Sequence, residues 1–461
     1  MPEQVSELEK NLGMEVYATQ TRGIGGVIRF FLEDFVVEEQ LLDGSIAKTS
    51  ISAVTTLVEP PHPEAWRKYL VCVLVKRGWD TILAGRRIAQ QLGIDFRDIH
   101  MAGIKDTRAI TAQHISLKNV GWKDLEKVRL EGVMLQPVGY SHRPVSPHIL
   151  LGNHFHITIR NIQLSKTETE ERIRETWKEL QTLGGFPNFF GHQRFGTVRP
   201  ITHKVGRALV KKNLEKAALT FLAEPSPFEH EDAREARRRL MEEKDFSKAL
   251  EFFPKRLKYE RLMLKHLAKR PSDFAGAFRK LPAQLRRLFV QAYQSYLFNR
   301  FLSRRMRLGI SLNEPQIGDF VVRMDKFGLP TPKHETASSS NIDAVKEEVR
   351  KGRACVALPL VGYVQELSRG KQGESEEEIL EEEHVRREDF RIPFLKEISL
   401  KGRLRVCLAS LKDFTFDQPR EDSVNFSKLM VRLRFMLIRG CYATVVLREF
   451  MKPRDIVAAG F

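Results

Sequence analysis

The chain has 461 residues, of which 42% are hydrophobic, and it carries a formal net charge of +17. This length predicts two or more domains with a sizeable core. The charge excludes a cationic partner and favours nucleic acid, with an anionic membrane surface as the second option.

The four cysteines are far apart and lie in apolar segments, without the close spacing of a zinc site. We therefore expect reduced, buried thiols and a cytoplasmic protein. The charged N-terminal residues contain no secretory signal, and no apolar run approaches the roughly 20 residues needed to cross a membrane.

The N-terminal third predicts strands with one clear helix among them. Residues 26–42 indicate a strand, a turn and a second strand, and residues 69–77 are a β-branched run typical of a buried strand. A helix follows and ends at Gly93. Further strands are expected at 112–120 and 149–161. Because no regular strand–helix–strand repeat appears, the pattern favours an α+β fold.

From about residue 165 to about 309 the chain is predicted to be mainly helical. Residues 255–310 contain 15 Lys and Arg against two acidic residues, an excess of +13. A polar, Ser-rich loop is expected at 333–345 and a solvated acidic helix at 371–389. The tail indicates two strands around a turn at Arg439-Gly440. This order predicts a helical domain inserted into a split β-rich domain.

The segment AGIKDTRAITAQ (102–113) places Lys105, Asp106 and Arg108 between two apolar runs. It can be an ordinary turn in which the Asp106 side chain bonds a backbone N–H. Alternatively, the neighbouring cations favour an ionised carboxylate that acts as a nucleophile or a base.

Three other segments also have two interpretations each. GFPNFFGHQRFGTVRP (185–200) mixes aromatic rings with cations, which suits RNA bases and phosphates, but the phenylalanines can equally be core. In GNHF (152–155), Asn153 and Phe155 can bind and stack on a pyrimidine, or Phe155 can simply fill the core. In 291–305, Tyr293, Leu297 and Phe301 predict an apolar helix face, with arginines available for phosphates.

The sequence lacks phosphate-binding, dinucleotide-binding, zinc-protease and serine-hydrolase motifs. His154 and His156 are two residues apart, but no third ligand accompanies them, so no metal site is predicted. If the chain is an enzyme, we expect it to need no cofactor.

Together, four segments resemble the TruD family of tRNA pseudouridine synthases, in its archaeal form. The matching patterns are F-x-V-x-E at 35–39, A-G-x-K-D-x-x-A-x-T-x-Q at 102–113, G-N-x-F at 152–155 and N-[FY]-F-G-x-Q-R-F-G at 188–196. The two longer patterns are specific, and the resemblance covers about residues 20 to 450. The chain departs from the family upstream of the first pattern, where Arg29 and Leu32 replace a lysine and a proline.

The resemblance implies that Asp106 is the catalytic aspartate and that the residues of the other motifs bind the uridine. It implies a pseudouridine synthase core with a curved, mostly antiparallel sheet and an inserted α/β domain. We accordingly divide the chain into 1–185 and 361–461 for the core and 186–360 for the insertion. The residues expected to contact substrate are Arg29, Phe35, Glu39, Lys105, Asn153, Phe155 and Arg194.

The implied activity is isomerisation of a tRNA uridine to pseudouridine, with position 13 as the expected target. Asp106 would either attack the ribose or remove its C2′ proton, and the sequence does not choose between these routes. The alternative is a non-catalytic RNA-binding or RNA-chaperone protein with the same basic surface. A membrane-surface protein fits less well, because tyrosines and glutamines interrupt the basic segment. The oligomeric state is not predicted.

Overall fold

The computed structural model describes residues 3–50 and 68–461. A nine-stranded sheet forms its centre, with seven strands in the order β13-β15-β6-β1-β4-β2-β5, while β14 pairs with β15 and β3 with β4. Of its pairs, only β1 and β4 run parallel. The strands are β1 (Phe35–Leu41), β2 (Tyr69–Arg77), β3 (Ile99–Met101), β4 (Ile110–Lys118), β5 (Val133–Ser141), β6 (Leu150–Ile162), β13 (Lys412–Phe416), β14 (Arg420–Glu421) and β15 (Leu429–Ile438).

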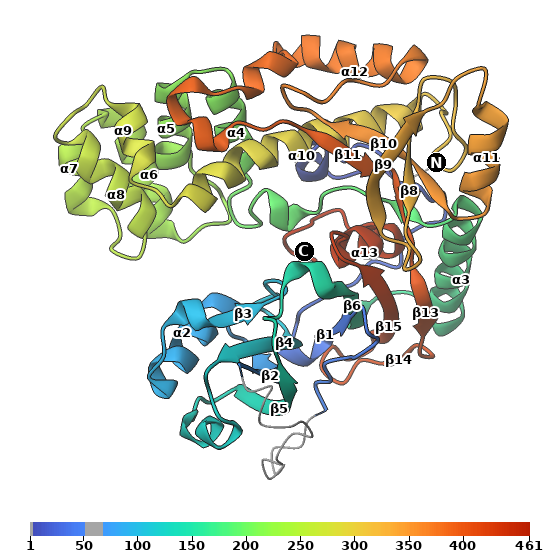
Figure 1. Ribbon diagram of the computed structural model, residues 1–461, viewed down its shortest axis with the longest axis horizontal. Helices are drawn as coiled ribbons and strands as arrows, with labels where there is room; N and C mark the ends of the chain where they lie inside the picture. Colours follow the sequence, from blue (N-terminus) through green and yellow to red (C-terminus); the bar gives the residue numbers. More distant parts are fainter. Residues whose placement is uncertain (1–2, 51–67) are drawn as a thin grey trace.

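A second, antiparallel sheet has the order β11-β10-β8-β9, and a short pair joins β7 to β12. In Figure 1 the four-stranded sheet lies above the large one, at the opposite end of the molecule from a lobe of short helices. These strands are β7 (Phe186–Pro187), β8 (Phe320–Met324), β9 (Pro330–Thr336), β10 (Ala354–Leu360), β11 (Arg403–Val406) and β12 (Leu408–Ala409). The α+β class is confirmed, with strands from both ends of the chain in one mostly antiparallel sheet.

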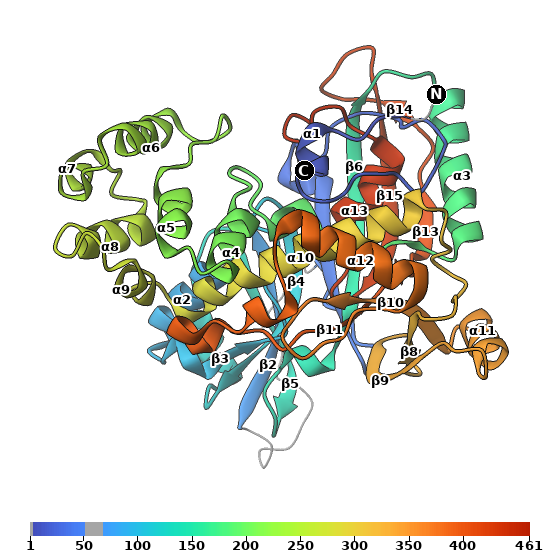
Figure 2. The ribbon, with the colours of Figure 1, turned by 90° about the horizontal axis from the view of Figure 1, so that it is seen from above.

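The helical lobe contains α5 to α9, and α10 extends from it across the molecule (Figures 1 and 2). The helices are α1 (Glu7–Lys10), α2 (Thr81–Leu92), α3 (Lys166–Leu183), α4 (Thr202–Val210), α5 (Leu214–Ala223), α6 (Glu231–Glu243), α7 (Phe246–Phe252), α8 (Lys258–Leu267), α9 (Phe274–Arg279), α10 (Ala283–Arg307), α11 (Ile342–Arg350), α12 (Gly370–Glu383) and α13 (Ala443–Met451). Among the described residues, no helix combines the length and apolarity needed to cross a membrane.

Helix α2 shows how local signals fix an element beside the loop between β3 and β4. The Asp80 side chain accepts a hydrogen bond from Leu83 N at 2.9 Å, and Gly93 ends the helix with a left-handed φ of 69°. Ile88 of this helix packs on Leu70 and Leu74 of β2. The prediction that Gly93 ends this helix is confirmed.

Helix α12 lies beside α10, as Figure 2 shows from above. The predicted acidic helix is confirmed, but its complete solvation is wrong, since Glu376 is fully buried. Glu378 and Glu382 form ion pairs with Arg304, and Glu382 also pairs with Arg300. The expectation that these arginines, together with Arg305, face a phosphate backbone is therefore wrong, because the buried Arg305 pairs with Asp319 at 2.7 Å.

Three other predicted elements are wrong. Before β1, only an isolated bridge from Val27 to Arg160 forms, because Arg29 adopts a left-handed φ of 56° that interrupts a strand. The Ser-rich loop is shorter than predicted, since β9 continues to Thr336 and α11 begins at Ile342. After the turn at Gly440 the tail forms helix α13, whose nine residues are all buried.

The domain boundaries 186–360 for the insertion stay a prediction. The β-rich part is nevertheless split in sequence, because β15 pairs with β6 in the sheet that also contains β1. The four-stranded sheet continues past residue 360, since β11 pairs with β10.

Candidate active site

The loop between β3 and β4 contains Asp106, and groups from three neighbouring elements hold its backbone. Thr81 Oγ1, at the start of α2, accepts a hydrogen bond from Lys105 N at 3.1 Å and donates one to Lys105 O at 3.2 Å. Gln113 Nε2 of β4 donates to Gly103 O at 3.0 Å. The backbone on the N-terminal side of Asp106 is thus fixed independently of its side chain.

Lys76, at the end of β2, is fully buried beneath this loop. Its Nζ donates to Asp106 O at 2.7 Å, to Trp79 O at 2.8 Å and, more weakly, to Lys105 O at 3.5 Å. Burial lowers the pKa of Lys76 to about 8, although the charges of Asp106 and Asp80 oppose this shift. Sequence analysis missed this residue; its only signal was a lysine near the end of an otherwise apolar strand.

The Asp106 carboxylate is bound by Arg29. Arg29 Nη2 lies 3.1 Å from Asp106 Oδ1, while Nη1 donates to Gly460 O at 3.0 Å. The Arg29 guanidinium also sits 4.1 Å above the Phe35 ring. The Asp106 side chain retains 34% of its exposure, so it is held on one side and open on the other.

The two cations adjacent in sequence do not contact that carboxylate. Lys105 Nζ pairs with Glu39 Oε2 at 2.6 Å, and Arg108 Nη2 donates to the backbone oxygen of Arg29 at 3.2 Å. The prediction that Lys105 or Arg108 binds the Asp106 carboxylate is therefore wrong. Lys105 points away because neighbouring side chains of an extended chain point to opposite sides. Arg108 is instead held by its hydrogen bond to the backbone oxygen of Arg29.

Glu39 is the centre of a buried cluster. Its Oε1 accepts a hydrogen bond from His114 N at 2.9 Å and lies 3.3 Å from the His114 ring, while Oε2 binds Lys105. Burial acts to raise the pKa of Glu39, but the His114 contacts and the Lys105 charge outweigh it, so the pKa is lowered. Lys105 thus stabilises the loop against β1.

Strand register places the other motif residues on one face of the sheet. In the β1–β6 pair, Glu39 lies opposite Asn153 and Val37 opposite Phe155. The Phe35 and Phe155 rings meet edge to face at 6.2 Å, and the buried Phe155 also stacks on Phe435 at 5.5 Å. Their side chains share a face because residues paired across strands point the same way.

Three acceptor-capable atoms on β4 and β6 are buried without a hydrogen-bond partner among the described residues. They are Asn153 Oδ1, Thr111 Oγ1 and Gln113 Oε1. Buried polar atoms are rarely left unpaired, because desolvation costs about 1–3 kcal/mol each. No described group thus fills the hydrogen bond that Asn153 Oδ1 can accept.

The N-F-F-G-x-Q-R-F-G segment (188–196) forms no hydrogen bond with the Asp106 loop in the described part of the chain and packs against α10 instead. Phe189, Phe190 and Phe195 are all buried, so the core interpretation of these rings is correct. Arg194 donates to Ser295 Oγ at 3.2 Å and Gln291 Oε1 at 3.4 Å of α10, and none of its hydrogen-bond partners belongs to the Asp106 loop.

His154 and His156 project from the other face of β6, where they contact Gln40 at 3.0 Å and Glu38 at 3.7 Å. The described residues contain no group of three or more His, Cys, Asp or Glu placed to bind a metal ion.

Comparisons with known proteins agree along nearly the whole chain. The family described as tRNA pseudouridine synthase D (TruD) matches residues 11–450. A Methanococcoides burtonii protein named "Probable tRNA pseudouridine synthase D" is 40% identical over 453 residues, covering 98% of this chain and 99% of that protein. A Methanosarcina barkeri protein of the same name is 42% identical over 450 residues, covering 97% and 98%.

The fold matches a crystal structure as well. That structure, titled "Putative tRNA pseudouridine synthase D (TruD)" and from Methanosarcina mazei, superimposes with a TM-score of 0.81 at 40% identity. The match covers 97% of this chain and 98% of the other.

Proposed function

The chain belongs to the TruD family of tRNA pseudouridine synthases, and on this premise we propose that it isomerises a uridine of tRNA to pseudouridine, with Asp106 as the catalytic group. The observation that carries the proposal is the Asp106 carboxylate, which is tethered by its backbone, bound by Arg29 through one oxygen and exposed to substrate on its other side. No second carboxylate is needed for this chemistry.

In this reaction the N1–C1′ glycosidic bond breaks, the uracil turns, and C5 bonds to C1′. The C5 proton is lost and N1 gains one, so atoms and electrons balance without a cofactor. Asp106 acts either by attacking C1′ or by removing the C2′ proton to give a glycal. Among the described residues Oδ2 of Asp106 has no hydrogen-bond partner, so this oxygen is available for either step.

The target nucleotide must leave its stack to reach Asp106, which costs a few kcal/mol. We propose that the free Asn153 Oδ1 accepts a hydrogen bond from the uracil N3–H. Phe35 and Phe155 supply an apolar wall for the ring, and Phe35 also carries the Arg29 guanidinium that orients Asp106. Glu39 and Lys105 act by holding the loop in place.

The test uses purified wild-type protein, Asp106→Asn and the matched control Asp98→Asn, from the short turn before β3. Each protein is incubated with a tRNA transcript, and pseudouridine is mapped by chemical modification and primer extension. We expect product from the wild type and Asp98→Asn, and RNA binding without product from Asp106→Asn. Pseudouridine formation by Asp106→Asn at the wild-type rate would overturn the assignment of Asp106.

The alternative, a non-catalytic RNA-binding or RNA-chaperone protein, predicts that wild type and Asp106→Asn behave alike. Mapping pseudouridines in tRNA from cells with and without the gene separates the two in vivo. We propose position 13 as the target, so this modification is expected to disappear on deletion. If the deletion strain retains every pseudouridine and has no isozyme, the proposed synthase activity is contradicted.

We also propose that the protein acts in the cytoplasm. Its four cysteines are free thiols, and burial raises the pKa of each one, with Cys355 and Cys441 reaching about 11. Such thiols are unreactive, which suits a reducing compartment.

A further inference from the structure

A groove of about 710 Å³ runs between the small sheet and the end of the large one. One wall comes from β11 and the β8–β9 hairpin, and the other from residues 147–150 and the turn after β15. Leu150 in this wall packs against Ala102 and approaches the position that a side chain at Gly103 would occupy. One lining residue of the groove therefore contacts the start of the loop that carries Asp106.

The lining of this groove is positively charged. Its residues include Arg403, Arg405 and Arg439 and no aspartate or glutamate. A second cavity, of about 640 Å³ between α4, α5 and α10, is also rich in cations, but there Glu224 pairs with Lys204 and Glu383 with Arg207. Only the first of these two cavities lacks acidic residues in its lining.

Arg405 is held rigidly while part of its guanidinium stays free. Its Nε and Nη2 donate to Asn188 O at 3.0 Å, Asn188 Oδ1 at 2.6 Å and Gly440 O at 3.0 Å. The guanidinium also lies 4.0 Å above the Phe190 ring. Within the described part of the chain, Nη1 makes no hydrogen bond. A fixed guanidinium with a free edge is well suited to a phosphate oxygen.

Arg194 lies behind the groove lining, and its guanidinium is 5.7 Å from the same Phe190 ring that Arg405 covers at 4.0 Å. Arg403 precedes Arg405 by two residues on β11, so like charges surround Arg405. Burial lowers the pKa of both Arg194 and Arg405, and the charge of Arg403 lowers each further. No carboxylate is among the groups that oppose these shifts; only Tyr442 and Cys441 do. In the described residues Arg403 is exposed and has no ion pair or hydrogen bond of its side chain. Three neighbouring cations without an acid repel one another, and an anion relieves that repulsion.

We propose that Arg194, Arg403 and Arg405 form a phosphate site that binds the tRNA backbone on the strand flanking the target nucleotide. This inference rests on the proposed function. It gives a role to Arg194, whose hydrogen-bond partners lie on α10 and not in the Asp106 loop. The tRNA backbone is the favoured source of the phosphate, because the groove lies between the two sheets and its Leu150 contacts the start of the loop that carries Asp106. Phosphate contacts of this kind position the RNA without reading its sequence.

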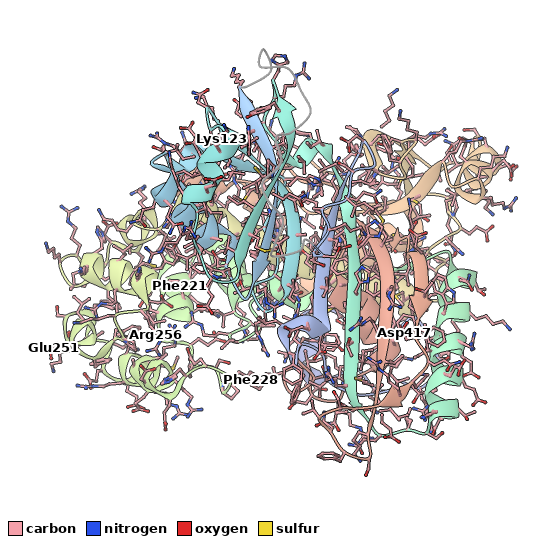
Figure 3. All side chains as sticks on the ribbon, turned by 90° about the horizontal axis from the view of Figure 1, so that it is seen from below. Lys123, Phe221, Phe228, Glu251, Arg256 and Asp417 are labelled. Atoms are coloured by element: carbon pink, nitrogen blue, oxygen red, sulfur yellow. The ribbon has the colours of Figure 1, made fainter. Side chains whose placement is uncertain are left out.

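The test compares Arg403→Gln with wild-type protein, because Arg403 is exposed and its side chain makes no hydrogen bond or ion pair with the described residues. The matched control is Arg256→Gln; Arg256 is also exposed but is paired with Asp232, and Figure 3 shows it on the helical lobe. Affinity for a tRNA transcript is measured by fluorescence anisotropy in 50–200 mM KCl. Loss of one phosphate contact lowers the slope of log K against log[KCl] by about 0.9.

We expect Arg403→Gln to bind roughly fivefold more weakly at 50 mM KCl. Raising KCl from 50 to 200 mM weakens tRNA binding of both proteins. The fold-decrease in affinity should be about 3.5 times smaller for Arg403→Gln than for the wild type, because the variant makes one phosphate contact fewer. Arg403→Lys should keep the salt slope, and Arg194→Gln should reproduce the effect of Arg403→Gln. Equal slopes for wild type and Arg403→Gln, or an equal loss in Arg256→Gln, would overturn the proposal.

A second arm separates RNA from free phosphate. Inorganic phosphate at 10 mM is added at constant ionic strength, and both the melting temperature and tRNA affinity are measured. Competition with tRNA in the wild type but not in Arg403→Gln supports the backbone site. The proposal is overturned if phosphate raises the melting temperature of the wild type but not of Arg403→Gln while tRNA affinity stays the same. The site would then bind a free anion and not the RNA backbone. Pseudouridine formation by the wild type is scored separately, so failure of this site is distinct from failure of the proposed function.

Discussion

Replacing Arg29 tests the central contact of the proposed active site. Arg29→Ala removes the 3.1 Å hydrogen bond to Asp106 and the 3.0 Å bond to Gly460 O. A hydrogen bond to a charged group contributes about 1.5–3 kcal/mol. Because the Asp106 side chain is 34% exposed, solvent screening places the loss near the lower end, about 1.5–2 kcal/mol. This corresponds to a rate roughly 10–30 times lower.

The measurement is single-turnover release of tritium from tRNA carrying [5-³H]uridine, since the C5 hydrogen is lost when C5 bonds to C1′. Saturating protein separates the chemical step from binding. Arg29→Lys should be intermediate, because one ammonium group cannot serve two acceptors as the guanidinium fork does. Thermal melts of both variants show whether the loss of rate reflects the site or the fold.

Arg108→Ala is the matched control, because Arg108 reaches only the backbone oxygen of Arg29. Its single-turnover rate should fall less than that of Arg29→Ala. If Arg29→Ala keeps its rate within twofold of wild type, or if Arg108→Ala is the slower variant, the assignment of Arg29 as the partner of Asp106 is refuted.

Three further predictions concern buried groups around the loop. Activity should fall as the pH rises through about 8, because Lys76 then loses the proton that supplies its third hydrogen-bond donor to the loop carbonyls; a flat rate between pH 7 and 9.5 would contradict this. Glu39→Gln should destabilise the protein by about 3–5 kcal/mol in urea unfolding, since Lys105 becomes a buried, unpaired charge, and an unchanged midpoint would count against it. Asn153→Ala should leave the melting temperature nearly unchanged, because Asn153 Oδ1 has no hydrogen-bond partner among the described residues, while kcat/KM falls roughly 10-fold or more; the reverse pattern would show a structural role.

The position of the Asp106 loop was predictable from sequence because its motif is long and local. Its ion pair was not, since Arg29 is 77 residues away and reaches Asp106 from a backbone with a positive φ. Sequence adjacency favoured Lys105 and Arg108, but chain direction turns one toward Glu39 and the other toward a backbone oxygen. Contacts between distant segments depend on the register of the sheet, which a single sequence does not specify.

The errors in secondary structure have a common cause. Helix α13 was predicted as a strand because its β-branched residues are buried on all sides, and a helix without an exposed face shows no period of 3.6. Strand β9 was missed for the opposite reason, since it is exposed or half-buried along its whole length and shows no alternation. Hydrophobic periodicity identifies elements with one buried face, such as α2, and loses the others.

The distribution of charge gives a different lesson about RNA binding. The strongest concentration of cations, in residues 255–310, suggested a phosphate-binding surface. Yet Arg300 and Arg304 are neutralised by the acidic helix α12, which follows about 70 residues later. Arg194, Arg403 and Arg405 come from two separate segments of the chain, and no acidic residue lines the groove. A phosphate competes poorly with a carboxylate already in contact, so unpaired cations rather than the densest cationic run predict the path of the RNA.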